Sequence, residues 1–199
     1  MATGEKSLSV YPKTVDCDGT AIEIRLFEHG HLEAVRQFAL KLETHDLLFL
    51  SRDLQHPKVI AAWHEAISDG EIASLVAFDG DTVVGTTAII RDSLGWSAHV
   101  AEIRLMIAAS MRGKGLGRIL LQSCIRDAVA AGAEKLTARM TPDQRGAIAL
   151  FEEIGFRGEA MLRDQVRDRD GKLHDLAIMS LNVARLGAHH GALGLSDAF

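Results

Sequence analysis

The stretch MRGKGLGR, Met111 to Arg118, places three glycines at every second position and joins two segments of regular structure. The segment before it, HVAEIRLMIAA (99–109), alternates between apolar and polar residues and predicts a strand. The segment after it is apolar at helical spacing and predicts a helix over 116–131 that ends at Gly132. Because glycine lowers helix stability, a loop that keeps three glycines indicates positive φ angles or a close approach to the backbone.

The other elements follow from hydrophobic periodicity and turn residues. Further helices are predicted over 30–43 and 57–70, and from the capping-box pattern Thr141-Pro142-Asp143-Gln144 to Gly155. Further strands are predicted over 20–27, on both sides of Asp79-Gly80-Asp81, over 134–140, and on both sides of Asp170-Gly171. The pattern predicts one mixed α/β domain over 20–183, an N-terminal extension over 1–19 and a flexible tail over 184–199.

Composition excludes several classes of protein. The formal net charge of −5 argues against a nucleic-acid-binding surface. MATGEKSLSV lacks an apolar signal segment and no apolar run reaches membrane-spanning length, so we expect a cytoplasmic protein with no membrane partner. Cys17 and Cys124 are too few for a disulfide framework. His189-His190 has no third ligand nearby, so no metal is expected.

The glycine loop has the chemistry of an anion site. A loop that enters a helix presents unpaired backbone N–H groups and the positive end of the helix dipole, and Arg112, Lys114 and Arg118 add positive charge. The spacing GxGxG matches neither a Walker loop nor the dinucleotide fingerprint GxGxxG. The loop therefore predicts a diphosphate cradle, with a glycine turn that only lets a helix pack closely as the alternative.

These residues resemble a known family. Arg112-x-x-Gly115-x-Gly117 is similar to the [QR]xxGx[GA] signature of the GNAT acetyltransferases, and AIALFEEIGF (147–156) resembles that family's AxxLYxxxGF segment. Leu105-Met106-Ile107 precedes the loop at the spacing of the family's fourth strand, and the order of elements agrees from about residue 20 to residue 183. The last strands, with RDRDGKLHDLAIMSL, resemble a bacterial subgroup whose substrates are mostly unassigned.

The resemblance implies a GNAT-like fold, with one mixed, mostly antiparallel sheet of about seven strands flanked by four helices. It also implies transfer of an acetyl group from acetyl-CoA to an amine by direct attack in a ternary complex. A bulge in the fourth strand would separate it from the fifth. The residues that it implies for the cofactor are Met106, Ile107 and Ala108 for pantetheine, Gly113, Lys114, Gly115, Leu116, Gly117 and Arg118 for the pyrophosphate, and Arg112, Gln144 and Phe151 beside them.

The chain departs from the family where protons are handled. The tyrosine that often protonates the leaving thiolate corresponds to Phe151, and a catalytic glutamate of some members corresponds to Arg139. Glu102 is one candidate base, with an ion pair to Arg104 on the same strand face as the alternative. His99 is a second candidate because histidine titrates near neutral pH, with an ordinary surface histidine as the alternative.

The acceptor is less well defined by the sequence. In such a fold the segment between the first two helices, here 44–57, borders the acceptor site. We expect a small amine or an amino-acid derivative, with a lysine-bearing protein as the runner-up. A non-catalytic acyl-CoA-binding module is a further alternative. A homodimer through the last strands is compatible with the sequence.

Overall fold

The computed structural model describes residues 11–184, which form a mixed α+β domain around one sheet. The strands are β1 (Lys13–Cys17), β2 (Thr20–Leu26), β3 (Ile72–Ala73), β4 (Leu75–Asp79), β5 (Thr82–Ile90), β6 (Val100–Ile107), β7 (Lys135–Met140), β8 (Arg157–Arg167) and β9 (Leu173–Asn182). The α-helices are α1 (Leu32–Lys41), α2 (Pro57–Ser68), α3 (Leu116–Ala130) and α4 (Arg145–Ile154). The sheet order is β1-β2-β4-β5-β6-β7-β9-β8, and β3 pairs with β5.

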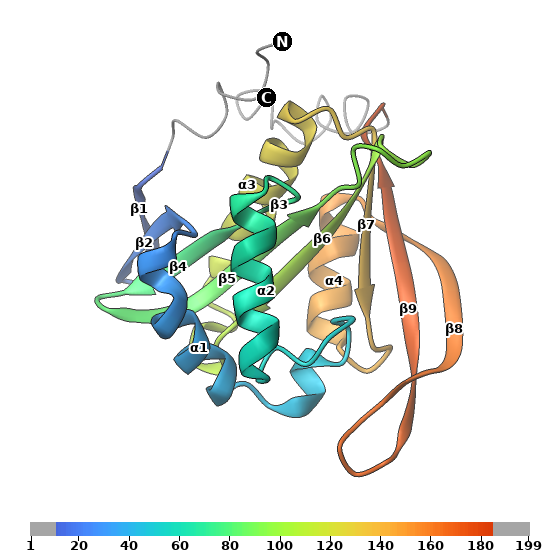
Figure 1. The fold of residues 1–199 in the computed structure, drawn as a ribbon, viewed down its shortest axis with the longest axis horizontal. Helices are drawn as coiled ribbons and strands as arrows, with labels where there is room; N and C mark the ends of the chain where they lie inside the picture. The colour runs from blue at the N-terminus through green and yellow to red at the C-terminus, as the bar shows by residue number, and fades with distance from the viewer. Residues whose placement is uncertain (1–10, 185–199) are drawn as a thin grey trace.

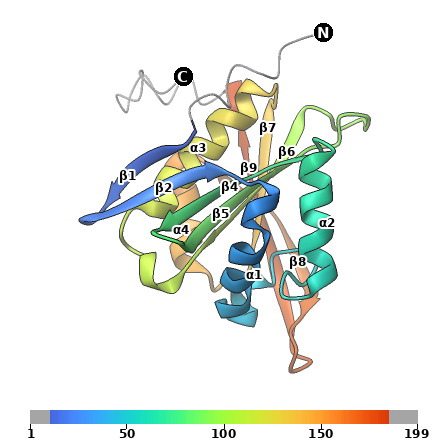
Figure 2. The same cartoon turned by 60° about the vertical axis from the view of Figure 1, so that its left-hand side comes forward.

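The helices cover both faces of the sheet. Figures 1 and 2 show α1 and α2 on one face and α3 and α4 on the other. Phe38 of α1 and Trp63 of α2 belong to one buried cluster, whereas Leu121 of α3 and Phe151 of α4 belong to another. Helices on both faces account for the burial of seven consecutive residues of β5, Val83 to Ile89, which include the threonines Thr86 and Thr87.

The sheet opens between its two central strands. β6 and β7 run parallel and pair only from Val100 to Glu102, opposite Lys135 to Thr137. β6 stays in register with β5 up to Ile107, while β7 stays paired along its length with β9. The separation, visible in Figure 1, therefore arises because β7 turns away with β9. The expected bulge in this strand is not present, since the register of β6 against β5 is unbroken from Glu102 to Ile107.

The structure corrects the expected elements at several points. It has nine strands instead of about seven, because β1 lies within the segment expected to be an extension and β3 is too short for a pattern to reveal. The last helix begins at Arg145 with Gln144 as its N-cap, because residues 141–144 form a turn in which the Gln144 N–H donates to the Thr141 carbonyl (3.0 Å). Within that turn the Thr141 N–H donates to the Gln144 side chain, as in the expected capping box. The tail beyond residue 184, with His189-His190, lies outside the described residues.

The helices also bear on the membrane question. Among residues 11–184, no helix is long and apolar enough to span a bilayer.

Candidate active site

A cavity of about 920 Å³ opens where β6 and β7 separate. Four parts of the chain form its walls: the end of β6, the glycine loop with the start of α3, the β7–α4 connection with α4, and the segment between α1 and α2. The predicted cofactor residues that line it are Met106, Ile107, Arg112, Gly113, Gly115, Gly117, Arg118, Gln144 and Phe151. The structure thus brings together most of the residues that the family resemblance implied. Ala108, Lys114 and Leu116 are not among the lining residues, and Leu116 is fully buried.

The glycines of the loop have two different functions. Gly113 and Gly115 have φ angles of +78° and +84°, which side-chain-bearing residues rarely adopt. A Cβ at Gly117 would lie 3.3 Å from Cδ2 of Leu150, so this glycine lets α3 approach α4. The first two glycines therefore serve the conformation of the loop, and the third serves packing.

The loop ends in a set of free backbone donors. Gly115 is the N-cap of α3 and the first helical hydrogen bond runs from the Ile119 N–H to the Gly115 carbonyl. The amides from Gly115 to Arg118 precede that bond and have no partner within the helix. The amide of Lys114, expected in the cradle, instead donates to the Met111 carbonyl (3.4 Å).

The arginines of the loop are paired with carboxylates. The Arg112 guanidinium contacts Asp46 of the α1–α2 segment, and that of Arg118 contacts Glu153 of α4. The positive potential of the loop that these two ion pairs do not offset comes from Lys114, the backbone amides and the α3 dipole.

The open edge of β6 offers a second set of backbone groups. The Ala108 N–H donates to the Val84 carbonyl (2.8 Å), so this amide is engaged with the strand on the far side from β7. Backbone groups alternate between the two edges of a strand, which directs Met106 toward β5 and Leu105 and Ile107 toward the gap. Of the expected trio, Ile107 thus presents its amide to the cavity together with Leu105, whereas the amides of Met106 and Ala108 face β5.

Neither predicted base lies in the cavity wall. The Glu102 carboxylate is bound by Arg104 Nε at 2.7 Å and Arg139 Nη2 at 3.5 Å, and its side chain is 17% exposed. His99 is exposed at the start of β6, at the opposite end from the glycine loop. The ion-pair alternative for Glu102 is therefore confirmed, and the structure does not bring His99 to the site.

The wall formed by α4 is apolar where the family often carries a hydroxyl. Phe151 is 4% exposed and packs edge to face on Phe156, with ring centroids 4.9 Å apart. Beside it, the Gln144 side-chain oxygen accepts the Thr141 N–H (3.2 Å), which leaves the side-chain NH₂ group as its donor toward the cavity.

The structure reveals one functional candidate that sequence reasoning missed. His45, in the one-turn helix Thr44–Leu47, places Nε2 2.8 Å from Oδ2 of Asp143 and 3.3 Å from the Thr141 hydroxyl. Both His45 and Asp143 line the cavity. The sequence places His45 in the segment expected to border the acceptor site. Its partners lie 96 or more residues away, however, and no local signal connects them.

The environment of Asp143 favours its charged form. Burial raises the pKa of this carboxyl, but the hydrogen bond from the Thr141 hydroxyl, a backbone hydrogen bond and the nearby imidazoles of His45 and His174 lower it. The net pKa lies below the ordinary aspartate value. Asp143 therefore faces His45 as a carboxylate at neutral pH.

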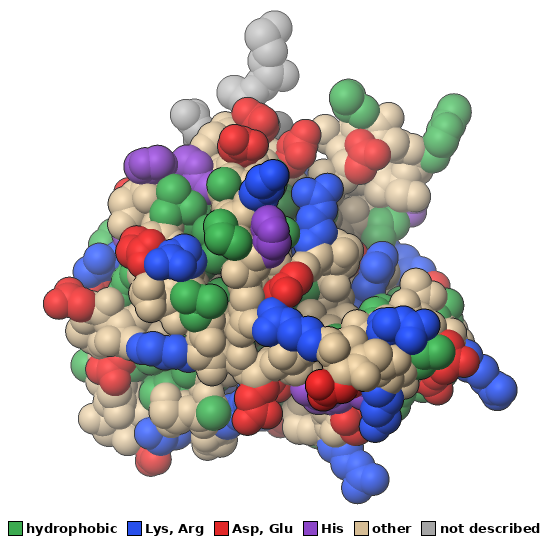
Figure 3. All heavy atoms as spheres, turned by 60° about the horizontal axis from the view of Figure 1, so that its bottom comes forward, with side chains coloured by type: hydrophobic (Ala, Val, Ile, Leu, Met, Phe, Trp, Pro, Cys, Tyr) green, Lys and Arg blue, Asp and Glu red, His purple; other side chains and the backbone are tan. Residues whose placement is uncertain are grey.

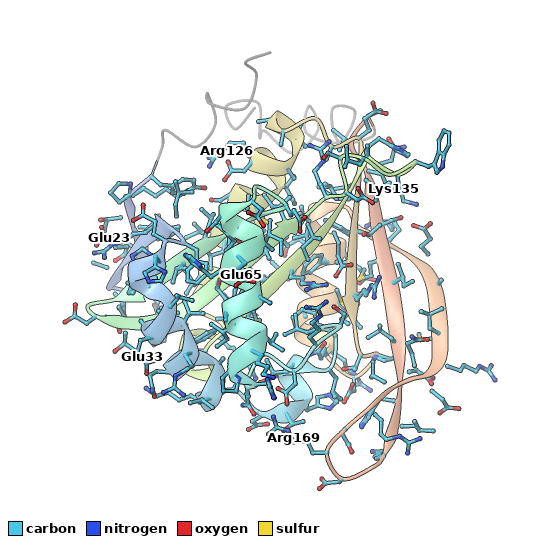
Figure 4. The ribbon with its side chains drawn as sticks, viewed as in Figure 1. Glu23, Glu33, Glu65, Arg126, Lys135 and Arg169 are labelled. Atoms are coloured by element: carbon cyan, nitrogen blue, oxygen red, sulfur yellow. The ribbon has the colours of Figure 1, made fainter. Side chains whose placement is uncertain are left out.

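The β8–β9 hairpin lies against the α1–α2 segment near His45. His174 stands with its ring centroid 5.4 Å from that of His45, and its Nε2 contacts Asp168 at 2.7 Å. The hydrogen bond from His174 lowers the pKa of Asp168. Arg169, labelled in Figure 4, pairs with Asp53 of the α1–α2 segment at 2.7 Å. Figure 3 shows that positive and negative side chains alternate over this end, without a field of one sign.

The grouping of possible metal ligands was also compared with what a metal site needs. Within residues 11–184, no three His, Cys, Asp or Glu side chains are grouped so that they could hold a metal ion.

The chain is similar to known acetyltransferases. Residues 36–156 match the profile of the Acetyltransferase (GNAT) family. A Bacillus subtilis (strain 168) protein, provisionally named a phosphinothricin acetyltransferase, is 28% identical over 163 residues, which cover 81% of this chain and 99% of that protein.

Solved structures share the fold at lower identity. A Salmonella typhimurium protein, provisionally named an acetyltransferase and solved with its cofactor acetyl-CoA, has a TM-score of 0.68 at 22% identity. The match covers 81% of this chain and 94% of that chain. A spermidine N-acetyltransferase of Vibrio cholerae, solved with CoA and spermine, has a TM-score of 0.68 at 19% identity and covers 83% and 97%. The family match spans more than half of the chain and the separated strands carry the expected cofactor cavity. The chain therefore belongs to the GNAT family of acetyltransferases, and it is an acyltransferase that uses acetyl-CoA.

Proposed function

We propose that this enzyme transfers the acetyl group of acetyl-CoA to the primary amine of a small molecule or an amino-acid derivative, with both substrates bound at once. The observation that carries the proposal is the single cavity in which the glycine loop and the separated edge of β6 meet the α1–α2 segment. The glycine loop and the edge of β6 suit an acyl-CoA thioester, and the α1–α2 segment borders the space for an acceptor beside it.

The cofactor half of the cavity is assigned mainly to backbone groups. The pyrophosphate would lie on the free amides from Gly115 to Arg118, at the positive end of α3. The pantetheine arm would extend along Leu105 and Ile107, whose amides lack a strand partner on that side. One of these amides would polarise the thioester carbonyl as a fixed donor for the developing oxyanion.

The acceptor half favours a compact, polar amine. Charged and ionisable side chains from the α1–α2 segment and the β7–α4 connection, including His45, Asp46 and Asp143, line that side. The Arg169–Asp53 contact ties the β8–β9 hairpin to the α1–α2 segment at this end. The Vibrio cholerae structure contains spermine, and the Bacillus subtilis relative is named for phosphinothricin. Both of these compounds are small amines.

Release of free thiol from acetyl-CoA tests the proposal. The assay uses a panel of small amines, amino acids and lysine-bearing peptides, with CoA binding measured in parallel by calorimetry. Acceptor-dependent release with small amines is expected. Release with lysine peptides alone would favour the protein-acetylating alternative. CoA binding without release from any acceptor would favour a binding module, and absence of CoA binding would overturn the cradle.

A further inference from the structure

The cavity offers few groups that can take a proton. The titratable carboxyl and imidazole side chains that line it are Glu43, His45, Asp46 and Asp143. Asp46 is paired with Arg112, Asp143 is held by its hydrogen bonds, and Glu43 is exposed. His45 supplies the imidazole of this lining, and its side chain is 35% exposed.

The contacts of His45 define which of its ring nitrogens carries the proton. Asp143, ionised and 2.8 Å from Nε2, stabilises the imidazole tautomer in which Nε2 carries the proton. Nδ1 then carries the lone pair. The Thr141 hydroxyl, which is fully buried, lies 3.3 Å from the same Nε2 and donates to Asp143, so it fixes both partners. This is a base oriented by a carboxylate, the arrangement by which enzymes activate histidine.

We propose that His45 is the base that removes a proton from the acceptor's ammonium group, with Asp143 and Thr141 as its positioning residues. The inference rests on the proposed acetyl transfer. It supplies a base in a chain that has Arg139 at the position where some family members carry a catalytic glutamate. It also agrees with the structure in leaving Glu102 to its ion pairs.

The charged groups around His45 favour the same direction of transfer. Asp143 faces it from the β7–α4 connection, and Asp46 and Glu43 lie on its own segment. His174, with its partner Asp168, faces it from the β8–β9 hairpin. The carboxylate in contact with the imidazole is that of Asp143, which opposes the positive charge that forms when His45 takes a proton.

The step balances as follows. An ammonium N–H bond breaks and its proton bonds to Nδ1 of His45, which leaves a neutral amine with a lone pair. The amine nitrogen bonds to the thioester carbonyl carbon, the C–S bond breaks, and its electron pair leaves on sulfur. The second proton of the nitrogen goes to sulfur, so free thiol and amide result. His45 then returns its proton to solvent.

The pH dependence of kcat/KM in His45→Gln tests the role, with spermidine and phosphinothricin as probe amines. We expect a loss of about 10²-fold or more at pH 7 with unchanged CoA affinity, since general base catalysis contributes about 10²–10⁴-fold. The loss should shrink as the pH approaches the pKa of the acceptor, because the free amine needs no base. Asp143→Asn should shift the same profile. His29→Gln, an exposed histidine outside the cavity lining, is the matched control.

A second measurement does not depend on the acceptor. Nitrogen NMR of the imidazoles in the full chain should show neutral His45 with Nε2 protonated and Nδ1 unprotonated, and Asp143→Asn should weaken that preference. A proton on Nδ1, or a His45→Gln enzyme that keeps its rate and pH profile, would overturn the role. If CoA binds but no amine of the acceptor panel releases thiol, the proposed function fails. If thiol is released and His45→Gln keeps its rate and pH profile, only the role of His45 fails.

Discussion

Two substitutions at Gly115 would separate the fold of the glycine loop from its charge. A Cβ at this position meets no heavy atom within 4 Å, so the cost of a side chain there is the φ of +84° alone. The left-handed conformation costs a non-glycine residue roughly 1–2 kcal/mol. Gly115→Ala and Gly115→Glu should therefore lower the free energy of unfolding by similar amounts. At about 2–4 °C per kcal/mol for a chain of this size, the melting temperature should fall by about 2–8 °C in each.

The two variants should differ in CoA binding. A glutamate beside the pyrophosphate places like charges together, and two unit charges at 4 Å repel by about 1 kcal/mol in water and about 4 kcal/mol near a protein surface. Relative to Gly115→Ala, the CoA dissociation constant of Gly115→Glu should rise by roughly 5-fold to 1,000-fold. Calorimetry with CoA at low salt and at 1 M salt measures the difference, which salt should reduce. Equal dissociation constants in the two folded variants would refute the assignment of the diphosphate to this loop.

Three further substitutions test the surroundings of the site. Phe151→Tyr should raise kcat by up to about tenfold by supplying a proton to the leaving thiolate, and an unchanged kcat would show that this proton transfer does not limit turnover. Glu102→Gln should lower the free energy of unfolding by about 1–3 kcal/mol, because it removes the charge that pairs with Arg104, and should leave the pH–rate profile unchanged; an altered profile would make Glu102 a base. The pKa of Asp168 is lowered in the folded chain by His174, so its stabilisation is complete above about pH 4 and is lost as the pH falls through the lower folded value. As the pH is lowered through this range, the melting temperature of Asp168→Asn should fall less than that of the unsubstituted chain. Equal falls would contradict a stabilising contact between Asp168 and His174.

Local sequence signals predicted most of the fold. The helices over 30–43, 57–70 and 116–131 are confirmed as α1, α2 and α3 within a few residues, because hydrophobic spacing, Pro57 and terminal glycines mark them locally. β1 was missed because two of its five residues are exposed and only Val15 and Cys17 form an apolar face.

The parts of the site that depend on pairing could not be read from the sequence. Which amides of β6 face the cavity follows from the Ala108–Val84 hydrogen bond, and strand alternation alone leaves both choices open. The contact of His45 with Asp143 joins two loops far apart in the chain. Sequence periodicity reports which residues share a face of one element, but it does not report which loops meet.

The short ladder between β6 and β7 has a consequence for the whole domain. Three residue pairs join β6 to β7. The sheet is therefore nearly divided into two parts, one that ends at β6 and one made of β7, β9 and β8. A pantetheine arm bound along Leu105 and Ile107 would take the place of a strand in the gap and would link the two parts of the sheet. Amide hydrogen exchange at these two residues should then slow when CoA is present, and ligand at 100 times its dissociation constant would add about 2.7 kcal/mol to the stability of the fold. The concentration of CoA would thereby set the stability of this enzyme against unfolding, as well as its rate.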